Sequence, residues 1–238
     1  MEPYLFYGTV LPTRAQISLS FDLGFSHITS GNIGRAKISI VLNEVAVTVH
    51  TEKEWNIFDL RNVVKNIVQS NLAMIGYLKG FAYDLEITRV LNSSVGVDYV
   101  FGIDVPCIAK PREPVDLGVE LEKLKLKTIG ANGVFLSRCF NDLIAAMKYA
   151  DDTGFYCYRA IEALRHHCAS VHKLVTADKN TQWQKFRDIS GIEELATRSL
   201  EDAARVTRHG EVAGMTDEAR VKLFNTTWNM VDSYIAQI

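Results

Sequence analysis

The placement of proline constrains this chain more than any other feature of its sequence. All five prolines occur before residue 115, and none follows up to position 238. Proline interrupts helix interiors because it lacks an amide donor and clashes with the preceding turn. A long half without proline is therefore typical of a helical bundle. The segment Lys110–Asp116, with two prolines and mixed charges, is predicted to link this half to the preceding one.

The half before this linker has the pattern of a β-sheet. The predicted strands are the apolar, β-branched or alternating runs at residues 4–10, 16–25, 36–42, 45–49, 81–91 and 96–103. Between residues 36 and 49, polar and apolar residues alternate with a period of two, which is typical of half-buried antiparallel strands. Tight turns are expected at Asn43-Glu44 and at Asn92-Ser93-Ser94.

One helix is predicted among these strands. Thr51 and Glu54 have the spacing of a capping box, in which the Thr51 hydroxyl accepts from the Glu54 amide. The residues expected on one face of the helix recur at steps of three and four: Leu60, Val64, Ile67, Asn71, Met74 and Leu78. Residues 1–110 are therefore predicted to form an α+β domain, whose role the sequence does not show.

After the linker, the hydrophobic period changes to 3.6 residues. The predicted helices cover residues 117–127, 132–149, 153–174, 180–189, 192–209 and 216–236, with glycines and an Asp-Asp-Thr turn between several of them. Residues 115–238 are therefore predicted to form an all-α helical bundle. The fold class is an α+β N-terminal domain followed by this bundle.

The distribution of charged residues and of cysteines excludes several classes of protein. Residues 1–114 carry 10 basic and 11 acidic groups, and residues 115–238 carry 16 and 17. Such balance argues against non-specific wrapping of nucleic acid. No run approaches the ~18 apolar residues of a spanning helix, and no secretory leader is evident. With four scattered cysteines and no CxxC, we expect a cytoplasmic protein with reduced thiols and no membrane contact.

Motifs for cofactors and metals are not found in the sequence. Cys168 and His172 are four residues apart and could share a helix face, but tetrahedral zinc needs two more ligands. The alternative is a packed thiol beside surface histidines. Neither GxxxxGK[ST] nor GxGxxG is present, and no elbow motif surrounds a serine or cysteine. We therefore predict no cofactor, no metal ion and no serine or cysteine nucleophile.

The segment Ala203–Gly210 has the residues for acid–base chemistry. Arg205 and His209 are four apart, so on a helix they face the same way. A histidine shuttles protons near neutral pH, and an arginine binds phosphate. Together they suffice for RNA cleavage in which a ribose 2′-hydroxyl attacks its own phosphate. The alternative is an ordinary helix end, since Gly210 follows basic residues in the last turn.

Four segments of the second half carry a family resemblance. These are Tyr156–Leu164, Trp183-x-x-Phe186-Arg187, Arg208-His209-Gly210 and the segment Trp228–Ile235. Over roughly residues 130–238 the chain resembles the HEPN superfamily, and most of all bacterial stand-alone proteins with an uncharacterised N-terminal region. The resemblance implies a helical bundle that forms homodimers. Many such proteins are metal-independent RNases in bacterial defence or stress response, and others are inactive binding scaffolds.

The sequence departs from the active HEPN pattern in one spacing. The RNases have four to six residues between Arg and His, whereas three separate Arg205 from His209, and Arg208 is adjacent to it. Glu162, on a neighbouring predicted helix, is expected to orient His209 or to pair with Arg165 or His166.

Two functions therefore stay open, and the sequence does not decide whether the protein is an enzyme. The first is an RNase, or degenerate RNase, acting on single-stranded RNA. In it His209 is the acid/base and Arg205 binds phosphate, with Arg208 and Glu162 in support. The second is a non-catalytic dimeric scaffold that binds a ligand or a protein partner, which the sequence does not identify.

Overall fold

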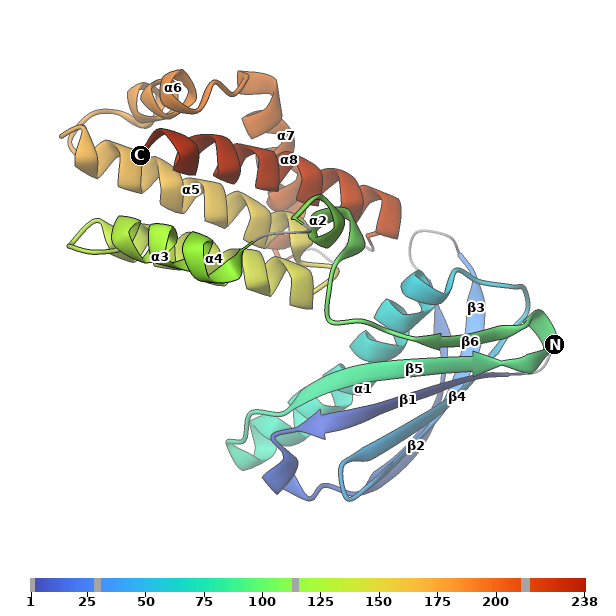
Figure 1. The fold of residues 1–238 in the computed structure, drawn as a ribbon. Coiled ribbons are helices and arrows are strands. Elements are labelled where there is room, and N and C mark those ends of the chain that lie inside the picture. Colours follow the sequence, from blue (N-terminus) through green and yellow to red (C-terminus); the bar gives the residue numbers. More distant parts are fainter. Residues whose placement is uncertain (1–2, 28–30, 113–115, 211–214) are drawn as a thin grey trace. The chain divides into compact units, whose positions relative to one another are not determined.

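The chain consists of two structural units. The computed structural model describes residues 3–27, 31–112, 116–210 and 215–238. Residues 1–103 form a unit with a six-stranded sheet and one long helix, and residues 104–238 form a helical unit (Figure 1). The predicted fold class, an α+β domain followed by a helical region, is confirmed. The division lies between Ile103 and Asp104, whereas the predicted limits were residues 110 and 115.

The sheet of the first unit is antiparallel throughout. Its strands are β1 (Tyr4–Leu11), β2 (Leu19–Ser26), β3 (Ile33–Val41), β4 (Glu44–Thr51), β5 (Asp84–Asn92) and β6 (Val97–Val100), in the order β2-β3-β4-β1-β5-β6. On β3 and β4 every second residue is buried, as the period of two predicted. The buried residues include Ile38, Ile40, Val45, Val47 and Val49, which form part of one core with the long helix.

The turn between β3 and β4 lies one residue earlier than predicted. Leu42 and Asn43 are its central residues, with φ angles of 48° and 75°, and Val41 pairs with Glu44. Asn43 is buried because its side chain has two partners: its Oδ1 accepts from the Ile17 amide at 2.8 Å, and its Nδ2 donates to the Thr13 carbonyl at 2.6 Å. These bonds fix Asn43 inside the turn.

The helix of the first unit, α1 (Ile57–Lys79), begins later than the predicted capping box. Its N-cap is Asn56, whose Oδ1 accepts from the amides of Phe58 and Asp59 at 2.8 and 3.2 Å. Thr51 instead ends β4, and its hydroxyl donates to the Lys53 carbonyl at 2.7 Å. The predicted capping box was therefore wrong, because Asn56 satisfies the first amides of the helix.

The buried face of α1 also differs from the predicted one. The buried apolar positions advance by four residues at each step, at Leu60, Val64, Val68, Leu72 and Gly76. Steps of four alone rotate a stripe by about 40° each time, so it winds around the helix. Such a stripe can follow a twisted sheet. Met74 and Leu78, predicted to share the face with Leu60, are consequently 58% and 80% exposed.

Each outer strand of the sheet is joined to its neighbour by a two-pronged ion pair. On β3, Arg35 donates from Nε and Nη2 to the carboxylate of Asp22 on β2, at 2.8 and 2.9 Å. On β5, Arg89 binds Asp98 of β6 in the same way, at 2.9 and 2.8 Å. These hydrogen bonds hold the pKa of each aspartate below its ordinary value.

The second unit is a bundle organised around one helix. Its helices are α2 (Pro106–Ala109), α3 (Leu117–Lys127), α4 (Gly133–Lys148), α5 (Thr153–Val171), α6 (Lys179–Ser190), α7 (Glu194–Arg208) and α8 (Asp217–Gln237). Helices α4, α6, α7 and α8 all pack on α5. Most of α5 is therefore buried, including Tyr158, Ile161 and Leu164. Six of these helices match the predicted segments, and α2 was not predicted.

The predicted linker is partly docked on the bundle. Ile108 of α2 is buried in the helical core, and α2 packs on α8. A 3₁₀ turn follows at Lys110–Arg112, where the Arg112 guanidinium binds the carboxylate of Asp232 at 2.6 and 2.7 Å. Residues 113–115 of the predicted linker lie outside the described residues.

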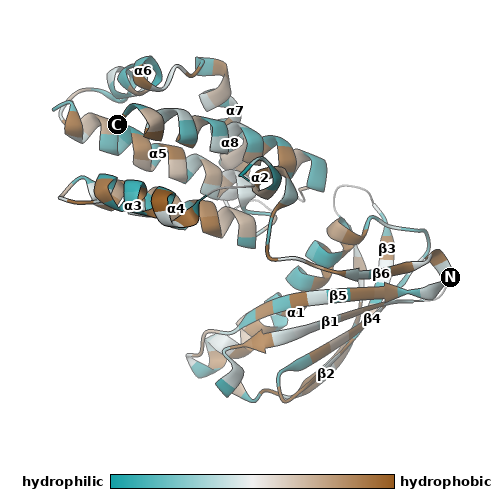
Figure 2. Ribbon diagram, viewed as in Figure 1, coloured by the Kyte–Doolittle hydropathy of each residue, from teal (hydrophilic) through white to brown (hydrophobic). Residues whose placement is uncertain are grey.

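Helix α3 differs from the other long helices because none of its residues is buried. Hydrophobic and hydrophilic residues alternate along it (Figure 2). Its exposed apolar residues are Leu117, Val119, Leu121 and Leu126. At its end, Lys127 Nζ donates to the carbonyls of Ile235 and Ile238 at 3.1 and 2.9 Å. In the described part of the chain, no helix has the length and apolar character needed to cross a membrane.

Candidate functional site

Arg205 and His209 lie at the C-terminal end of α7. His209 is the C-cap residue, and its amide donates to the carbonyls of Arg205 and Val206, both at 3.2 Å. Gly210 follows with a φ of 75°, a conformation that favours glycine. The helix end thus explains Gly210. Both side chains are exposed, and neither forms a hydrogen bond or ion pair within the described ranges.

Arg208 lies against a buried tyrosine of α5. Its Cζ is 5.6 Å from the ring centroid of Tyr158, which is only 1% exposed. Burial raises the pKa of Tyr158, as do the negative charges of Glu162 and Glu201, while Arg208 opposes these effects. Tyr158 is therefore neutral near pH 7.

Glu162 reaches the same tyrosine through a lysine. Its carboxylate is 3.5 Å from Nζ of Lys179, the first residue of α6, and this Nζ is also 3.5 Å from the Tyr158 hydroxyl. Its ion-pair partner is thus Lys179, and not the expected His209, Arg165 or His166. Arg165 instead binds Gln182 and lies 2.9 Å from the His166 ring. We call Tyr158, Glu162, Lys179, Glu201 and Arg208 the Tyr158 cluster.

The residues of α7 connect this cluster to the predicted pair. Glu201, Arg205 and Arg208 are separated by four and three residues, so they share one face of the helix. Glu201 and Arg208 both reach Tyr158, and Arg205 lies between them in sequence. His209 is one turn beyond Arg205. Arg208 and Glu162 therefore both lie near Tyr158, whereas no side-chain contact among the described residues joins Arg205 or His209 to this group.

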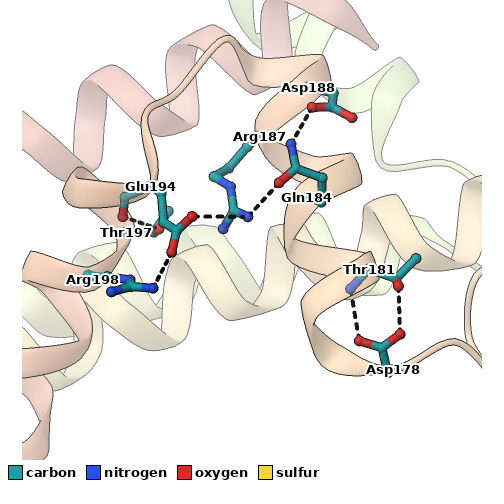
Figure 3. A network of polar contacts seen from close by, with 8 residues as sticks. All are labelled: Asp178, Thr181, Gln184, Arg187, Asp188, Glu194, Thr197 and Arg198. Carbon is teal, nitrogen blue, oxygen red and sulfur yellow. Dashed lines mark hydrogen bonds and ion pairs between the residues drawn. The ribbon is translucent and has the colours of Figure 1, made fainter.

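A cavity of about 790 Å³ lies between α6 and α7 and includes Tyr158 in its wall. Its lining residues are mostly polar: Tyr158, Asn180, Thr181, Trp183, Gln184, Arg187, Glu194, Thr197, Arg198, Glu201 and Asp202. Figure 3 shows that Glu194 lies between two arginines. It is 3.7 Å from Arg187 and also binds Arg198. Gln184 accepts from Arg187 at 2.8 Å. Glu194 thus pairs with both arginines, and with Glu201 and Asp202 the lining has three carboxylates against two guanidinium groups.

The sequence analysis did not identify Tyr158, Lys179 or Glu201. Tyr158 has the spacing of an apolar helix face together with Phe155, Ile161 and Leu164. This pattern predicts a core residue and gives no indication that the hydroxyl has polar neighbours. Lys179 is 21 residues away from Tyr158, so no local pattern connects the two. Glu201 could have been found from its four-residue spacing to Arg205.

The histidines and cysteines near the end of α5 differ in burial. His167 is buried, and its Nδ1 lies 2.8 Å from the Tyr234 hydroxyl, whereas the exposed His166 stacks on Phe135. Cys168 is buried, and His172 is exposed at the end of the helix. Within the described residues, no group of three or more His, Cys, Asp or Glu side chains could hold a metal ion.

All four cysteines are free thiols. Cys139, Cys157 and Cys168 are buried, and burial raises the pKa of each thiol, that of Cys157 to about 11. Since the thiolate is the reactive form, these side chains stay protonated and unreactive near neutral pH.

Comparison with known families matches both units of the chain. Residues 4–101 match the N-terminal domain, and residues 121–238 the C-terminal domain, of the family described as "Domain of unknown function (DUF8168)". The first match lies within the sheet unit, and the second begins inside α3 and covers the helices α4 to α8. No curated protein and no solved structure matches the chain.

Proposed function

The chain belongs to the DUF8168 family, both of whose domains it carries, and on that premise we propose a function for its helical unit. This unit is a HEPN-like domain that cleaves single-stranded RNA without a metal ion. The observation that carries the proposal is the pair Arg205 and His209, exposed one helical turn apart and next to the Tyr158 cluster. The shorter spacing leaves both residues on one face of α7.

In the proposed reaction each residue has one task. His209 accepts the proton of a ribose 2′-hydroxyl, and the 2′ oxygen attacks the adjacent phosphorus. Arg205 binds the phosphate and stabilises the charge that develops on it. The bond from phosphorus to the 5′ oxygen breaks, and that oxygen takes up the proton that His209 accepted from the 2′-hydroxyl. The products are a 2′,3′-cyclic phosphate and a 5′-hydroxyl, and no oxidant is consumed. Arg208 and Lys179 supply further positive charge nearby.

Cleavage by the full chain in chelator tests this proposal. Single-stranded RNA should be cut by the wild type, and the rate should fall about 100-fold or more in His209→Ala and in Arg205→Ala. His172→Ala is the matched control, since His172 is also an exposed histidine at a helix C-cap. It should cut like the wild type. Undiminished cleavage by folded His209→Ala would reject the proposed role of His209.

The second part of the proposal is a homodimer through the helical unit. Its support is the apolar surface of α3, together with the exposed Val134 and Ile144 of α4. Leu117 and Leu121 share one face of α3, and exposed apolar side chains gathered on one face are typical of protein contacts. Sedimentation should show dimers that Leu121→Lys and Leu126→Lys dissociate. The control Leu195→Lys, at an exposed leucine of α7, should remain dimeric. A wild type that is monomeric at all concentrations would contradict this part.

A non-catalytic scaffold is the second candidate function. It is favoured by the cavity between α6 and α7, where three carboxylates (Glu194, Glu201 and Asp202) exceed the two arginines, so that the lining does not attract an RNA backbone. A scaffold would bind a ligand or RNA, and Arg205→Ala would abolish this binding. It would cleave no RNA of any tested sequence. We place the protein in the cytoplasm in either case, a location supported by its four free thiols.

A further inference from the structure

The central helix α5 reaches the surface of the bundle along one stripe. Between positions 155 and 166, the side chains that are not buried are Phe155, Tyr156, Arg159, Glu162 and His166. All but Tyr156 follow one another at steps of four, three and four, so they lie on one face of the helix. We call Phe155, Arg159, Glu162 and His166 the α5 stripe. At 1.5 Å per residue it is roughly 16 Å long.

Two arginines share one carboxylate beside the α5 stripe. Arg138 of α4 lies 3.6 Å from the carboxylate of Asp142, and Arg159 lies 3.1 Å from it. The guanidinium of Arg159 also lies over the ring of Phe155, with Cζ 5.2 Å from the centroid. The Asp142 side chain is only 7% exposed, whereas that of Arg138 is 62% exposed. One buried carboxylate does not neutralise two guanidinium groups, so positive charge remains at the surface.

Helices α6 and α7 bring further charge to the stripe. Lys179 of α6, whose side chain is 50% exposed, lies 3.5 Å from Glu162. Arg208 of α7 lies over Tyr158, and the negative charge of Glu201 acts on the same tyrosine. Five cationic side chains thus stand against three carboxylates: Arg138, Arg159, Arg165, Lys179 and Arg208 against Asp142, Glu162 and Glu201.

The buried member of this group, Arg165, has no carboxylate partner. Arg165 is 5% exposed and forms no ion pair within the described ranges. Its Nη1 donates to Gln182, its Nη2 donates to His166 at 2.9 Å, and its Nε has no hydrogen-bond partner. A buried cation without an opposite charge destabilises a fold. A negatively charged ligand on the surface above Arg165 would offset part of that cost.

His166 presents a fixed ring at the end of the stripe. Because a guanidinium only donates, Nε2 of His166 accepts from Arg165 and the ring proton lies on Nδ1. The ring stacks on Phe135 of α4, with centroids 6.0 Å apart and planes at 20°. A flat side chain held in this way on an exposed surface is a platform on which a nucleic-acid base can stack.

From these relations we infer that single-stranded RNA lies along the α5 stripe, with phosphates bound by Arg138 and Lys179 and a base stacked on His166. A phosphodiester chain matches both the excess of positive charge and the exposed ring, whereas an acidic peptide matches the charge alone. The inference rests on the proposed function, because it extends the RNA site from His209, past its neighbour Arg208, onto α5.

Binding of 2′-O-methyl RNA tests the inference, because this probe lacks the nucleophilic hydroxyl and is not cleaved. A short fluorescent oligonucleotide should bind the full chain, as measured by anisotropy at several salt concentrations. Arg138→Gln and Lys179→Gln should each weaken binding about threefold or more and reduce the slope of log K against log salt by about one. Lys222→Gln, at an exposed lysine of α8, is the matched control and should bind like the wild type.

The base contact is tested by two substitutions of His166. His166→Ala should weaken binding roughly fivefold or more, because the platform is removed. His166→Phe keeps a ring that can stack on Phe135, so it should retain most of the affinity. Both variants should keep the salt dependence of the wild type, since the neutral ring contributes no charge. Circular dichroism establishes that each variant is folded before binding is compared.

Three results would overturn the inference. These are no binding of the oligonucleotide by the wild type, unchanged binding by both Arg138→Gln and Lys179→Gln, or equal affinity for poly-glutamate that His166→Ala does not reduce. Cleavage assays separate the inference from the proposed function. If the wild type cleaves RNA and no stripe variant binds more weakly, the stripe is rejected and the RNase stands. If the stripe variants bind more weakly and unmodified RNA is never cleaved, the RNase alone is rejected.

Discussion

The guanidinium of Arg208 lies over the ring of Tyr158, with Cζ 5.6 Å from the ring centroid. Arg208 is exposed at the last turn of α7, and Tyr158 is buried in α5. A cation above an aromatic ring at an exposed site contributes about 0.5–1 kcal/mol. This contact holds the turn that carries Arg205 and His209 in a defined place on the central helix of the bundle.

The hydroxyl of Tyr158 should contribute to stability as well as to position. In Tyr158→Phe the ring remains, but the buried hydroxyl and its contact with Nζ of Lys179 at 3.5 Å are lost. We expect the free energy of unfolding to fall by about 1 kcal/mol, measured by urea denaturation. Tyr77→Phe, at a tyrosine that is 87% exposed, should leave the unfolding midpoint unchanged. An equal loss in both variants would contradict the role of the buried hydroxyl.

Two glycines of the bundle should respond to alanine in opposite directions. A Cβ at Gly154 of α5 would lie 2.9 Å from the Ala203 carbonyl oxygen of α7, so Gly154→Ala must push the two helices apart. We expect it to lower the free energy of unfolding by about 1–3 kcal/mol. Gly118→Ala should raise it by about 0.5–1 kcal/mol, because alanine favours the helix and the nearest atom is a side-chain oxygen at 3.4 Å.

Urea or thermal unfolding measures both glycine variants side by side. Because Gly154 lies where α7 crosses α5, Gly154→Ala should also slow RNA cleavage, whereas Gly118→Ala should not. If Gly154→Ala were as stable as the wild type, α7 would be able to shift away from α5 without loss of free energy.

Substitution of Asn43 should lower the free energy of unfolding more than most substitutions in the sheet unit. Asn43→Ala would leave the buried Ile17 amide without its acceptor, at a cost of about 1–3 kcal/mol. It would also place alanine at a φ of 75°, which adds about 1 kcal/mol. Asn43→Gly should lose the hydrogen bonds alone, so the difference between the two variants measures the backbone cost. If Asn43→Ala and Asn43→Gly were equally stable, the positive φ at this position would carry no cost for alanine.

Stability should decline on mild acidification because of His167. Burial, and secondarily the charge of His172, lowers the pKa of His167 below its ordinary value of 6.5. As pH falls through 6.5, the unfolded chain takes up a proton before the folded chain does. The free energy of unfolding therefore decreases with falling pH, by at most about 1.4 kcal/mol per pH unit for this group. The loss ends once pH is below the folded-state pKa.

Urea midpoints of the wild type and His167→Gln between pH 5.5 and 8 measure this effect. The variant should show a shallower dependence on pH. His166, whose pKa is also lowered by burial and then by Arg165, contributes with the same sign, so His166→Ala should be measured in parallel. An unchanged slope in His167→Gln would assign the pH dependence to other groups.

The sequence predicted those parts of the fold that depend on local pattern. The alternation from residue 36 to 49 identified β3 and β4, and the period of 3.6 identified the long helices of the bundle. The predictions that failed depended on partners distant in sequence. The turn at Leu42-Asn43 is set by bonds to Thr13 and Ile17, and the buried face of α1 is set by the sheet beneath it.

The candidate site shows the same division between local and distant information. The four-residue spacing of Arg205 and His209 predicted their common helix face, since spacing along one helix is visible in sequence. The partner of Glu162 was not predictable, because Lys179 belongs to another helix and reaches Glu162 only after α6 has packed on α5. Likewise, a tyrosine among apolar neighbours gives no sign that its hydroxyl lies 3.5 Å from a lysine of another helix.

The two ion pairs at the margins of the sheet have a consequence for self-association. An open strand edge is a template for further strands, and a sheet that loses an outer strand exposes a longer, more hydrophobic edge. Arg35 with Asp22, and Arg89 with Asp98, hold β2 and β6 against their neighbours by two bonds each. These exposed pairs add to the backbone ladders that keep the inner strands β3 and β5 covered. When both pairs are removed, heating should end in fibrous aggregates instead of reversible unfolding.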